Sequence, residues 1–251
     1  MCNEPDPWIE SFRETAVGWL LGSEAAPGRL PKVVLLPMEN PDVYDDGWIK
    51  ESASDLEACG TLTVATVGGS RIAFSSPKFG APAVAMAVDV FAKAGFQAVV
   101  GVGFCGGLQS EVKCGDLVLP SAALREEGAS HQYASADHAA ACSPTALELA
   151  LQCADKLDLA VKTGAICTTD GILRETRDKV ERWHDAGCLG VDMETAALYT
   201  VASAMGMDAV AILIASDNVY QREQTDLDRL REGWRSATRL ALEVCGQLAK
   251  S

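Results

Sequence analysis

The sequence has few histidines and no closely paired cysteines. Its three histidines, at positions 131, 138 and 184, show no metal-ligand spacing, and none of its nine cysteines forms a CxxC pair. An odd number of cysteines, several of them inside apolar runs, is typical of reduced thiols in a cytosolic protein. We therefore predict no metal site and a cytoplasmic location.

Long hydrophobic runs and an excess of positive charge are also missing. No apolar run reaches the ~20 residues of a membrane span, and residues 1–6 are too polar for a signal peptide. The 21 Lys and Arg residues stand against 35 Asp and Glu residues, which gives a formal net charge of −14. Because such a chain repels polyanions, we expect neither nucleic acid nor a membrane as a partner, whereas a small neutral molecule fits.

The sequence does contain an alternation of apolar strands and amphipathic helices. Strands are predicted at 32–37, 61–67, 71–76, 98–103, 116–120, 161–167 and 209–214, and helices at 8–21, 82–95, 144–157, 175–186, 193–206 and 225–250. This order predicts an α/β fold with a largely parallel sheet. Since no repeat or linker interrupts it, we predict a single domain over 1–251, with 1–30 as an N-terminal helical extension.

A glycine-rich motif follows one of the predicted strands. Residues 101–106 fit the pattern G-x-G-x-x-G, and Glu126 and Glu127 lie about twenty positions on, as a dinucleotide site needs. The helix that should receive the pyrophosphate is missing, because residues 107–115 lead into another strand. We expect no dinucleotide cofactor. The glycines indicate either a tight turn or a strand end that approaches a ligand or another strand.

Four segments carry a resemblance to a known family. They are residues 106–118, with Val-Lys-Cys-Gly-Asp, residues 125–130, residues 190–199, with Val-Asp-Met-Glu-Thr-Ala, and residues 216–218 with the following 223–225. In this order they resemble the nucleoside phosphorylase-I family of purine nucleoside phosphorylases, uridine phosphorylases and methylthioadenosine/S-adenosylhomocysteine nucleosidases. The resemblance implies a three-layer α/β/α fold around a mixed, largely parallel, twisted sheet. It also implies an enzyme that breaks the N-glycosidic bond of a nucleoside without a cofactor.

The resemblance assigns roles to residues of the third and fourth segments. It implies that Glu194 binds the ribose 2′,3′-diol, since a carboxylate can accept two hydroxyl hydrogen bonds, and that Met193 packs on the sugar. The alternative is that Glu194 only caps a helix, and Asp192 has the same two interpretations. Asp217 is implied to hydrogen-bond or protonate N7 of a purine, because the base leaves as an anion. Its alternative is a turn or capping role.

The remaining substrate-binding candidates follow from the same resemblance. They come from the glycine-rich motif and from the segment that lines the base pocket in the family: Phe104, Cys105, Gly106, Thr169, Asp170 and Ile172. The family often has an aromatic residue at the position of Ile172, which would stack on the base more strongly than isoleucine. The presence of Asp217 favours a purine, and a uridine phosphorylase-like activity is the alternative.

The phosphate ligands of the family are missing from this sequence. The first strand is followed by residues 38–43, a segment that is acidic and contains no arginine. Gly101 and Phe104 stand where the family has an arginine and a hydroxyl residue. Lys78 is the only nearby cation that the sequence offers. A dianion beside Glu39 would be disfavoured. We therefore expect water to replace phosphate, activated by Glu39 as a nearby glutamate does in the nucleosidase branch.

Two further interpretations remain open. The protein could be a phosphorylase whose phosphate donors come from a neighbouring subunit, because the family forms dimers or hexamers and we expect a homo-oligomer here. It could also be a non-catalytic nucleoside-binding protein, which would keep Glu194 and could lose Asp217 without losing binding.

Overall fold

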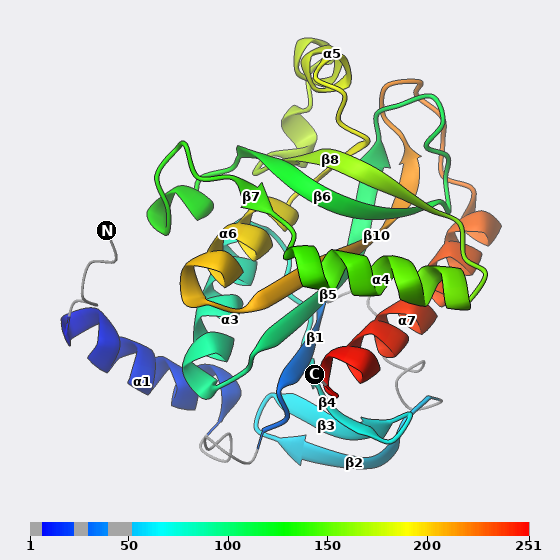
Figure 1. The fold of residues 1–251 in the computed structure, drawn as a ribbon. Coiled ribbons are helices and arrows are strands. Elements are labelled where there is room, and N and C mark those ends of the chain that lie inside the picture. The colour runs from blue at the N-terminus through cyan, green and yellow to red at the C-terminus, as the bar shows by residue number, and fades with distance from the viewer. Residues whose placement is uncertain (1–6, 23–29, 40–51, 251) are drawn as a thin grey trace.

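The computed structural model describes residues 7–22, 30–39 and 52–250 (Figure 1). The predicted role of the acidic segment after the first strand therefore rests partly on residues 40–43, which lie outside the described residues. The elements are α1 (Pro7–Leu21), β1 (Val33–Met38), β2 (Ser54–Cys59), β3 (Leu62–Val67), β4 (Ser70–Ser75), α3 (Ala81–Ala94), β5 (Ala98–Gly107), β6 (Leu117–Glu126), η1 (Ser130–Gln132), β7 (Ala140–Ala141), α4 (Pro144–Lys156), β8 (Val161–Thr169), η2 (Ile172–Arg174), α5 (Arg177–Asp185), β9 (Gly190–Asp192), α6 (Thr195–Met205), β10 (Asp208–Asn218) and α7 (Leu227–Leu248).

The described strands form one mixed sheet in the order β10-β6-β8-β9-β5-β1-β4-β3-β2. An additional pairing between β10 and β5 closes the first five of these strands into a ring. The long ladders β5–β10 and β6–β8 are parallel, whereas β10–β6, β5–β9 and the β2–β3–β4 meander are antiparallel. Long parallel strands are covered on both faces, which explains the continuous apolar runs of β1 and β5.

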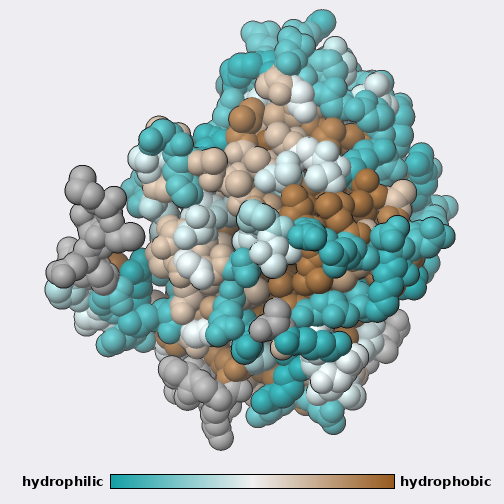
Figure 2. Space-filling view, viewed as in Figure 1, coloured by the Kyte–Doolittle hydropathy of each residue, from teal (hydrophilic) through white to brown (hydrophobic). Residues whose placement is uncertain are grey.

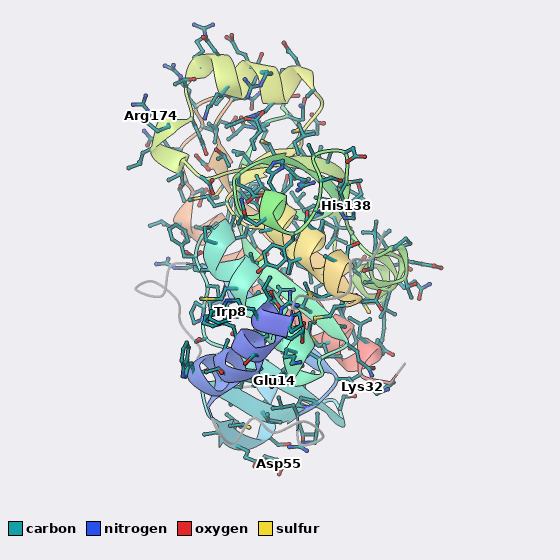
Figure 3. All side chains as sticks on the ribbon, turned by 90° about the vertical axis from the view of Figure 1, so that its left-hand side faces the viewer. Trp8, Glu14, Lys32, Asp55, His138 and Arg174 are labelled. Carbon is teal, nitrogen blue, oxygen red and sulfur yellow. The ribbon has the colours of Figure 1, made fainter. Side chains whose placement is uncertain are left out.

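Helices cover the sheet on both sides. Figure 1 shows α3 and α6, with α1 outside them, on one side and α4 and α7 on the other. The predicted α/β/α layers are therefore confirmed. In the view of Figure 1, the surface shows hydrophobic residues toward the centre, surrounded by hydrophilic residues (Figure 2). Seen from the side, Arg174 at the end of η2 and Asp55 in β2 lie at opposite ends of the molecule (Figure 3).

Several strands extend beyond their predicted ends, β6 to Glu126 and β8 to Thr169 among them, and two of these strands, β5 and β10, end at the site. β5 does not turn at its glycines but continues to Gly107, pairing with β10 and β9. Gly106 is required there, because a Cβ at this position would lie 2.4 Å from Cγ2 of Val219. The tight-turn interpretation is thus wrong, and the close-approach interpretation is right. β10 likewise extends to Asn218, so that Asp217 lies within the strand rather than after it.

A second, smaller hydrophobic core packs α5 against one end of the sheet. It contains Trp183 of α5, which is fully buried, together with Leu108, Cys167, Val180, Cys188 and Val191. His184 stacks on Tyr220 with ring centroids 3.7 Å apart, and its Nδ1 lies 2.9 Å from the carbonyl oxygen of Leu108. These contacts fix α5, and with it the segment from η2 to α5, beside the carboxyl ends of β5 and β10.

Candidate active site

The carboxyl ends of β5 and β10 place polar groups side by side. In the register of the two strands Ala215 faces Cys105 and Asp217 faces Gly106, with Ser216 as an extra residue between them. Such a bulge re-aims the side chains that follow it, and bulges are common beside active sites. The Ser216 hydroxyl donates to Oδ1 of Asp217 at 2.7 Å, which fixes the orientation of that carboxylate.

A cavity of about 410 Å³ opens at these strand ends. Its described walls come from β1, β5, β9, β10, η2, the start of α6 and α7: Met38, Glu39, Phe79, Phe104, Cys105, Gly106, Ile172, Glu175, Val191, Asp192, Met193, Glu194, Ser216, Asp217, Val219 and Leu230. A ligand crevice at the carboxyl ends of parallel strands is the expected place for a site in an α/β fold. A larger depression of about 610 Å³, against α4 and α7, contains none of the predicted site residues.

Glu194 is held with its carboxylate toward this cavity. It is 4% exposed, and its two oxygens accept from the backbone N–H groups of Gly80 at 2.7 Å and Met193 at 3.1 Å. Each oxygen keeps a further lone pair for another donor. Burial, and then the negative charge of Asp192, raise the pKa of Glu194, against the opposing effect of the two N–H donors. Glu194 occupies the N-cap position of α6, but its side chain makes no capping hydrogen bond.

Asp192 supplies the capping interaction instead. One carboxylate oxygen accepts from both the backbone N–H and the hydroxyl of Thr195, and the other accepts from the Thr168 hydroxyl at 2.6 Å. Burial raises the pKa of Asp192, and these hydrogen bonds lower it. Because Thr195 and Thr168 already contact both oxygens, the geometry favours the interpretation that Asp192 positions α6 and β9, and with them Glu194.

Asp217, Ile172 and Leu230 line the same cavity, and Phe104 of its wall packs against Trp234 with ring centroids 5.3 Å apart. Cys105 is buried at the same wall, and burial, followed by the charges of Asp192 and Asp217, raises the pKa of its thiol strongly. A thiol held neutral in this way is a poor nucleophile at neutral pH.

Three predicted residues lie outside the described walls of the cavity. Thr169 is buried where β8 pairs with β6, and Asp170 accepts from the backbone N–H of Gly128 at 2.9 Å. Lys78 donates to the hydroxyl and carbonyl oxygens of Ser76 at 2.7 and 3.0 Å. Asp170 and Lys78 thus have local partners in this structure, and the three roles remain predictions.

Several side chains that line the cavity are not marked by the sequence, among them Phe79, Glu175 and Leu230. Leu230 stands in the first turns of α7. Glu175 lies in a polar stretch between η2 and α5, so no local pattern marks it as part of a site. Only the packing of α5 on the sheet brings it to the cavity.

The described walls carry acids but no cation. Five carboxyl residues, Glu39, Glu175, Asp192, Glu194 and Asp217, line the cavity, and no Lys or Arg is among the described lining residues. Within the described ranges no group of three or more His, Cys, Asp or Glu side chains is arranged to hold a metal ion, and no helix there has the length and apolar character of a membrane span. The cavity therefore suits a neutral, hydroxyl-rich ligand better than an anion.

The fold and the cavity together define an α/β enzyme with its ligand at the strand ends. The chain belongs to the phosphorylase superfamily, whose sequence profile matches residues 32–250. It is 27% identical over 202 residues to the guanosine phosphorylase of Halorubrum lacusprofundi, covering 80% of this chain and 79% of that protein. It is 28% identical over 232 residues to the DeoD-type purine nucleoside phosphorylase of Bacillus cytotoxicus, covering 89% and 97%.

A solved structure agrees with these relatives. The uridine phosphorylase from Vibrio fischeri ES114 superposes with a TM-score of 0.79 at 26% identity, covering 88% of this chain and 95% of that one. The family, the fold class and the assignment as an enzyme of nucleoside cleavage are therefore confirmed. The names of the relatives include purine nucleosides, guanosine and uridine, so the base is not decided by them.

Proposed function

We propose that the protein cleaves the N-glycosidic bond of a purine ribonucleoside, with Glu194 at the ribose and Asp217 at the base. The observation that carries this proposal is the single cavity that has both carboxyl groups in its wall, with Met193 beside Glu194. A cavity of about 410 Å³ is of the size that holds a small-molecule ligand. The resemblance of residues 190–199 and 216–218 to the family implies the same assignment, with Glu194 at the ribose and Asp217 at the base.

The ribose end is pre-organised by the backbone. Because Gly80 and Met193 fix both oxygens of Glu194, the carboxylate need not reorient when the two hydroxyls of a ribose bind. The base end is supported by Asp217, whose orientation Ser216 fixes. Cleavage passes through an oxocarbenium-like state in which the base takes the bonding electrons, so a hydrogen bond or proton at the base lowers the barrier.

The attacking group that we propose is water rather than phosphate. A phosphate dianion would lie among five carboxyl residues without a cation on the described walls. Like charges ~5 Å apart repel by about 3 kcal/mol at an effective dielectric constant of about 20. Glu39 lies in the wall near enough to Glu194 for its charge to raise the pKa of that residue. It is the carboxylate that we assign to activating the water.

The test is a panel of inosine, adenosine, guanosine, uridine and methylthioadenosine, each incubated with and without phosphate and analysed for free base. We expect base release from a purine nucleoside in phosphate-free buffer. A strict requirement for phosphate would refute water as the attacking group, and release from uridine alone would refute the purine assignment.

A variant pair separates an enzyme from a non-catalytic binding protein. Asp217→Ala should abolish base release while changing nucleoside affinity little. Asp228→Ala is the matched control, because Asp228 is exposed on α7 and its carboxylate pairs with Arg231 on the same helix. Equal activity of wild type and Asp217→Ala would contradict the role of Asp217.

We also propose that the protein is a cytoplasmic homo-oligomer that needs no cofactor. The support for assembly is the apolar side of α1, where Trp8 is 82% exposed and Trp19 is 68% exposed, with Phe12 between them (Figure 3 labels Trp8). Exposed aromatic side chains of this kind mark interaction surfaces more often than free surface. Light scattering after size-exclusion chromatography measures the state, and a monomeric mass would contradict the proposal.

A further inference from the structure

Glu175 lies between two cavities. It follows η2 and precedes α5, and its side chain lines the active-site cavity together with Asp217 and Val219. The same residue and Val219 also line an outer cavity of about 550 Å³. Glu175 and Val219 therefore belong to the walls of both cavities.

The surroundings of Glu175 disfavour its charged form. The wall that it shares includes the apolar Ile172, Val219 and Leu230, and among the carboxyl groups of that wall Asp217 is the one whose charge acts on Glu175. Burial, and then the negative charge of Asp217, raise the pKa of Glu175 to about 7, while Lys179 on α5 lowers it.

The outer cavity adds four charged or titratable groups: Arg177, Glu181, Tyr220 and Arg222. Arg177 is paired with Glu181 at 2.6 Å, which leaves less of its charge for Glu175. Tyr220 is held in its stack on His184. The neighbour that Glu175 meets inside the active-site cavity is thus a second acid, not a base.

We infer that Glu175 is a further acid of the site and that Glu175 and Asp217, as an acid pair, protonate the leaving base. The inference rests on the proposed function, and it adds a catalytic residue that no motif marks. Two carboxyl groups in the wall of one cavity repel each other when both are ionised, and this repulsion adds to burial in favouring the protonated form of Glu175. Such a pair can donate a proton at the pH at which a lone exposed carboxyl group would have lost it.

The step balances as a hydrolysis. The O–H bond of the acid pair breaks, and its proton forms the N–H bond at N7 of the purine. The electron pair of the C1′–N9 bond moves into the base, which leaves neutral. The water oxygen forms the new bond to C1′ and gives its proton to the Glu39 carboxylate. Solvent then returns one proton to the acid pair and removes one from Glu39, which restores the starting state.

The test uses the dependence on the leaving group. Glu175→Gln is compared with wild type on a purine nucleoside and on 4-nitrophenyl riboside, whose phenolate leaves without needing a proton. We expect kcat/KM to fall about 100-fold for the purine nucleoside, the usual size of a general-acid effect, and by less than threefold for the aryl riboside. In wild type the rate on the nucleoside should fall as the pH rises through about 7, and this fall should be absent in the variant.

Controls keep the outcomes apart. Glu148→Gln removes an exposed carboxyl group of α4 that lines neither cavity and should leave the rates on both substrates unaffected. Glu175→Leu, which extends the apolar wall, should show the same substrate-dependent loss as Glu175→Gln and provides a second variant if one of them is unstable. An equal loss on both substrates, or no loss on either, would overturn the inference. A wild-type protein that cleaves neither substrate would instead refute the proposed function.

Discussion

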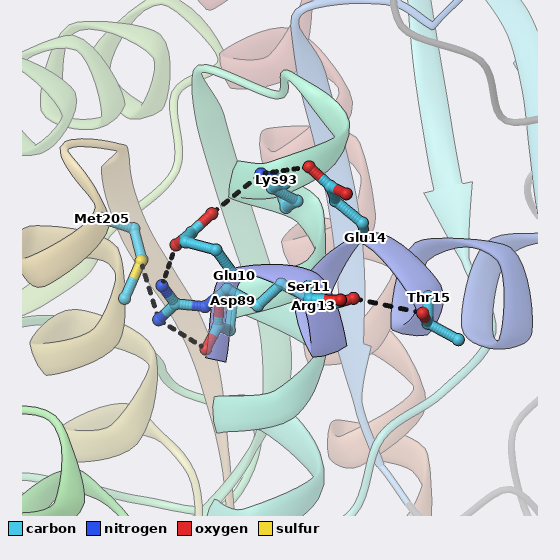
Figure 4. Close-up of polar contacts among 8 residues, drawn as sticks. All are labelled: Glu10, Ser11, Arg13, Glu14, Thr15, Asp89, Lys93 and Met205. Carbon is cyan, nitrogen blue, oxygen red and sulfur yellow. Dashed lines mark hydrogen bonds and ion pairs between the residues drawn. The ribbon is translucent and has the colours of Figure 1, made fainter. Parts of the chain in front are cut away.

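Two regions of the molecule shift the pKa of a glutamate side chain in opposite directions. On α1, Glu10 accepts from Lys93 at 2.8 Å and from Arg13 at 2.7 Å (Figure 4), and these hydrogen bonds, that of Lys93 first, hold its pKa below the ordinary value. In the cavity, Glu175 meets burial and the charge of Asp217, and its pKa rises to about 7. Cations stabilise the charged form in one region, and their absence from the described walls favours the protonated form in the other.

The opposite pKa shifts distinguish acids that stabilise the fold from acids to which we assign a chemical role. The charges of α1 dock a helix on α3, where Arg13 also pairs with Asp89 at 2.7 Å. The cavity brings together acids that repel one another, an arrangement that lowers the stability of the folded chain. Strongly shifted acids inside a cleft are characteristic of functional sites, because proton transfer near neutral pH needs such groups.

The largest expected effect comes from removing the acid at the ribose end. Glu194→Gln should lower kcat/KM for the preferred nucleoside by about 100-fold or more, because the amide cannot accept at both positions where Gly80 and Met193 donate and so cannot hold the diol in the same geometry. Glu10→Gln is the matched control and should stay within twofold of wild type. Initial rates with free-base detection measure both, and similar losses in the two variants would break the comparison.

A smaller effect is expected from removing the cation that docks α1. Arg13→Ala breaks the ion pairs with Glu10 and Asp89 and should lower the free energy of unfolding by about 1–2 kcal/mol, since the pairs are only partly shielded from solvent. Urea unfolding measures the change. Activity should be retained, and a loss of turnover without a loss of stability would contradict the separation of the two regions.

The stability of the chain should depend on pH with opposite signs in the two regions. The folded chain binds the Glu175 proton up to about pH 7, whereas the unfolded chain releases it near the ordinary glutamate value of about 4.3, so Glu175 makes stability fall as the pH rises through this window. After allowance for partial exposure the effect is about 1 kcal/mol. Glu10 acts in the other direction and in a lower pH window, because its lowered pKa stabilises the folded chain above about pH 4.3 and this contribution is lost as the pH falls below that value.

Urea unfolding at pH 5 and pH 8 tests this sign. In Glu175→Gln the fall between the two pH values should shrink, and in Glu10→Gln it should stay as in wild type, because Glu10 is ionised in both the folded and the unfolded chain across this range. Unchanged pH dependence in the Glu175 variant would show that burial and Asp217 do not hold its proton.

The sequence predicted the fold well where apolar runs are continuous and less well where strands lose their side chains. β1 and the helices were found from periodicity and from capping residues. The last part of β5, from Gly103 to Gly107, resembles a turn locally because glycine has a low strand propensity. Its pairing with β10 depends on residues more than a hundred positions away, and no local pattern reports that contact.

The site residues likewise divide into those that lie in sequence motifs and those that only long-range packing brings to the cavity. Glu194, Met193 and Asp217 lie in recognisable motifs, and the cavity contains all three. Glu175 lies among charged residues that resemble a solvent-exposed surface, and the packing of α5 brings it to the cavity. Asp170, which the resemblance predicts to line the base pocket, accepts a hydrogen bond from the backbone N–H of Gly128. Long-range packing, rather than residue type, decided these positions.

The smallest expected effect concerns contact with the base. Ile172 is 55% exposed at the cavity wall, and Ile172→Phe would add a ring that can stack on a purine. Such a contact contributes about 0.5–1 kcal/mol, so KM should fall two- to fivefold with kcat little changed. Leu173→Phe is the matched control, because Leu173 is 94% exposed and is not among the lining residues of the cavity. An equal change in both variants would mean that Ile172 does not meet the base, and the base end would then be defined by Asp217 and Glu175 alone.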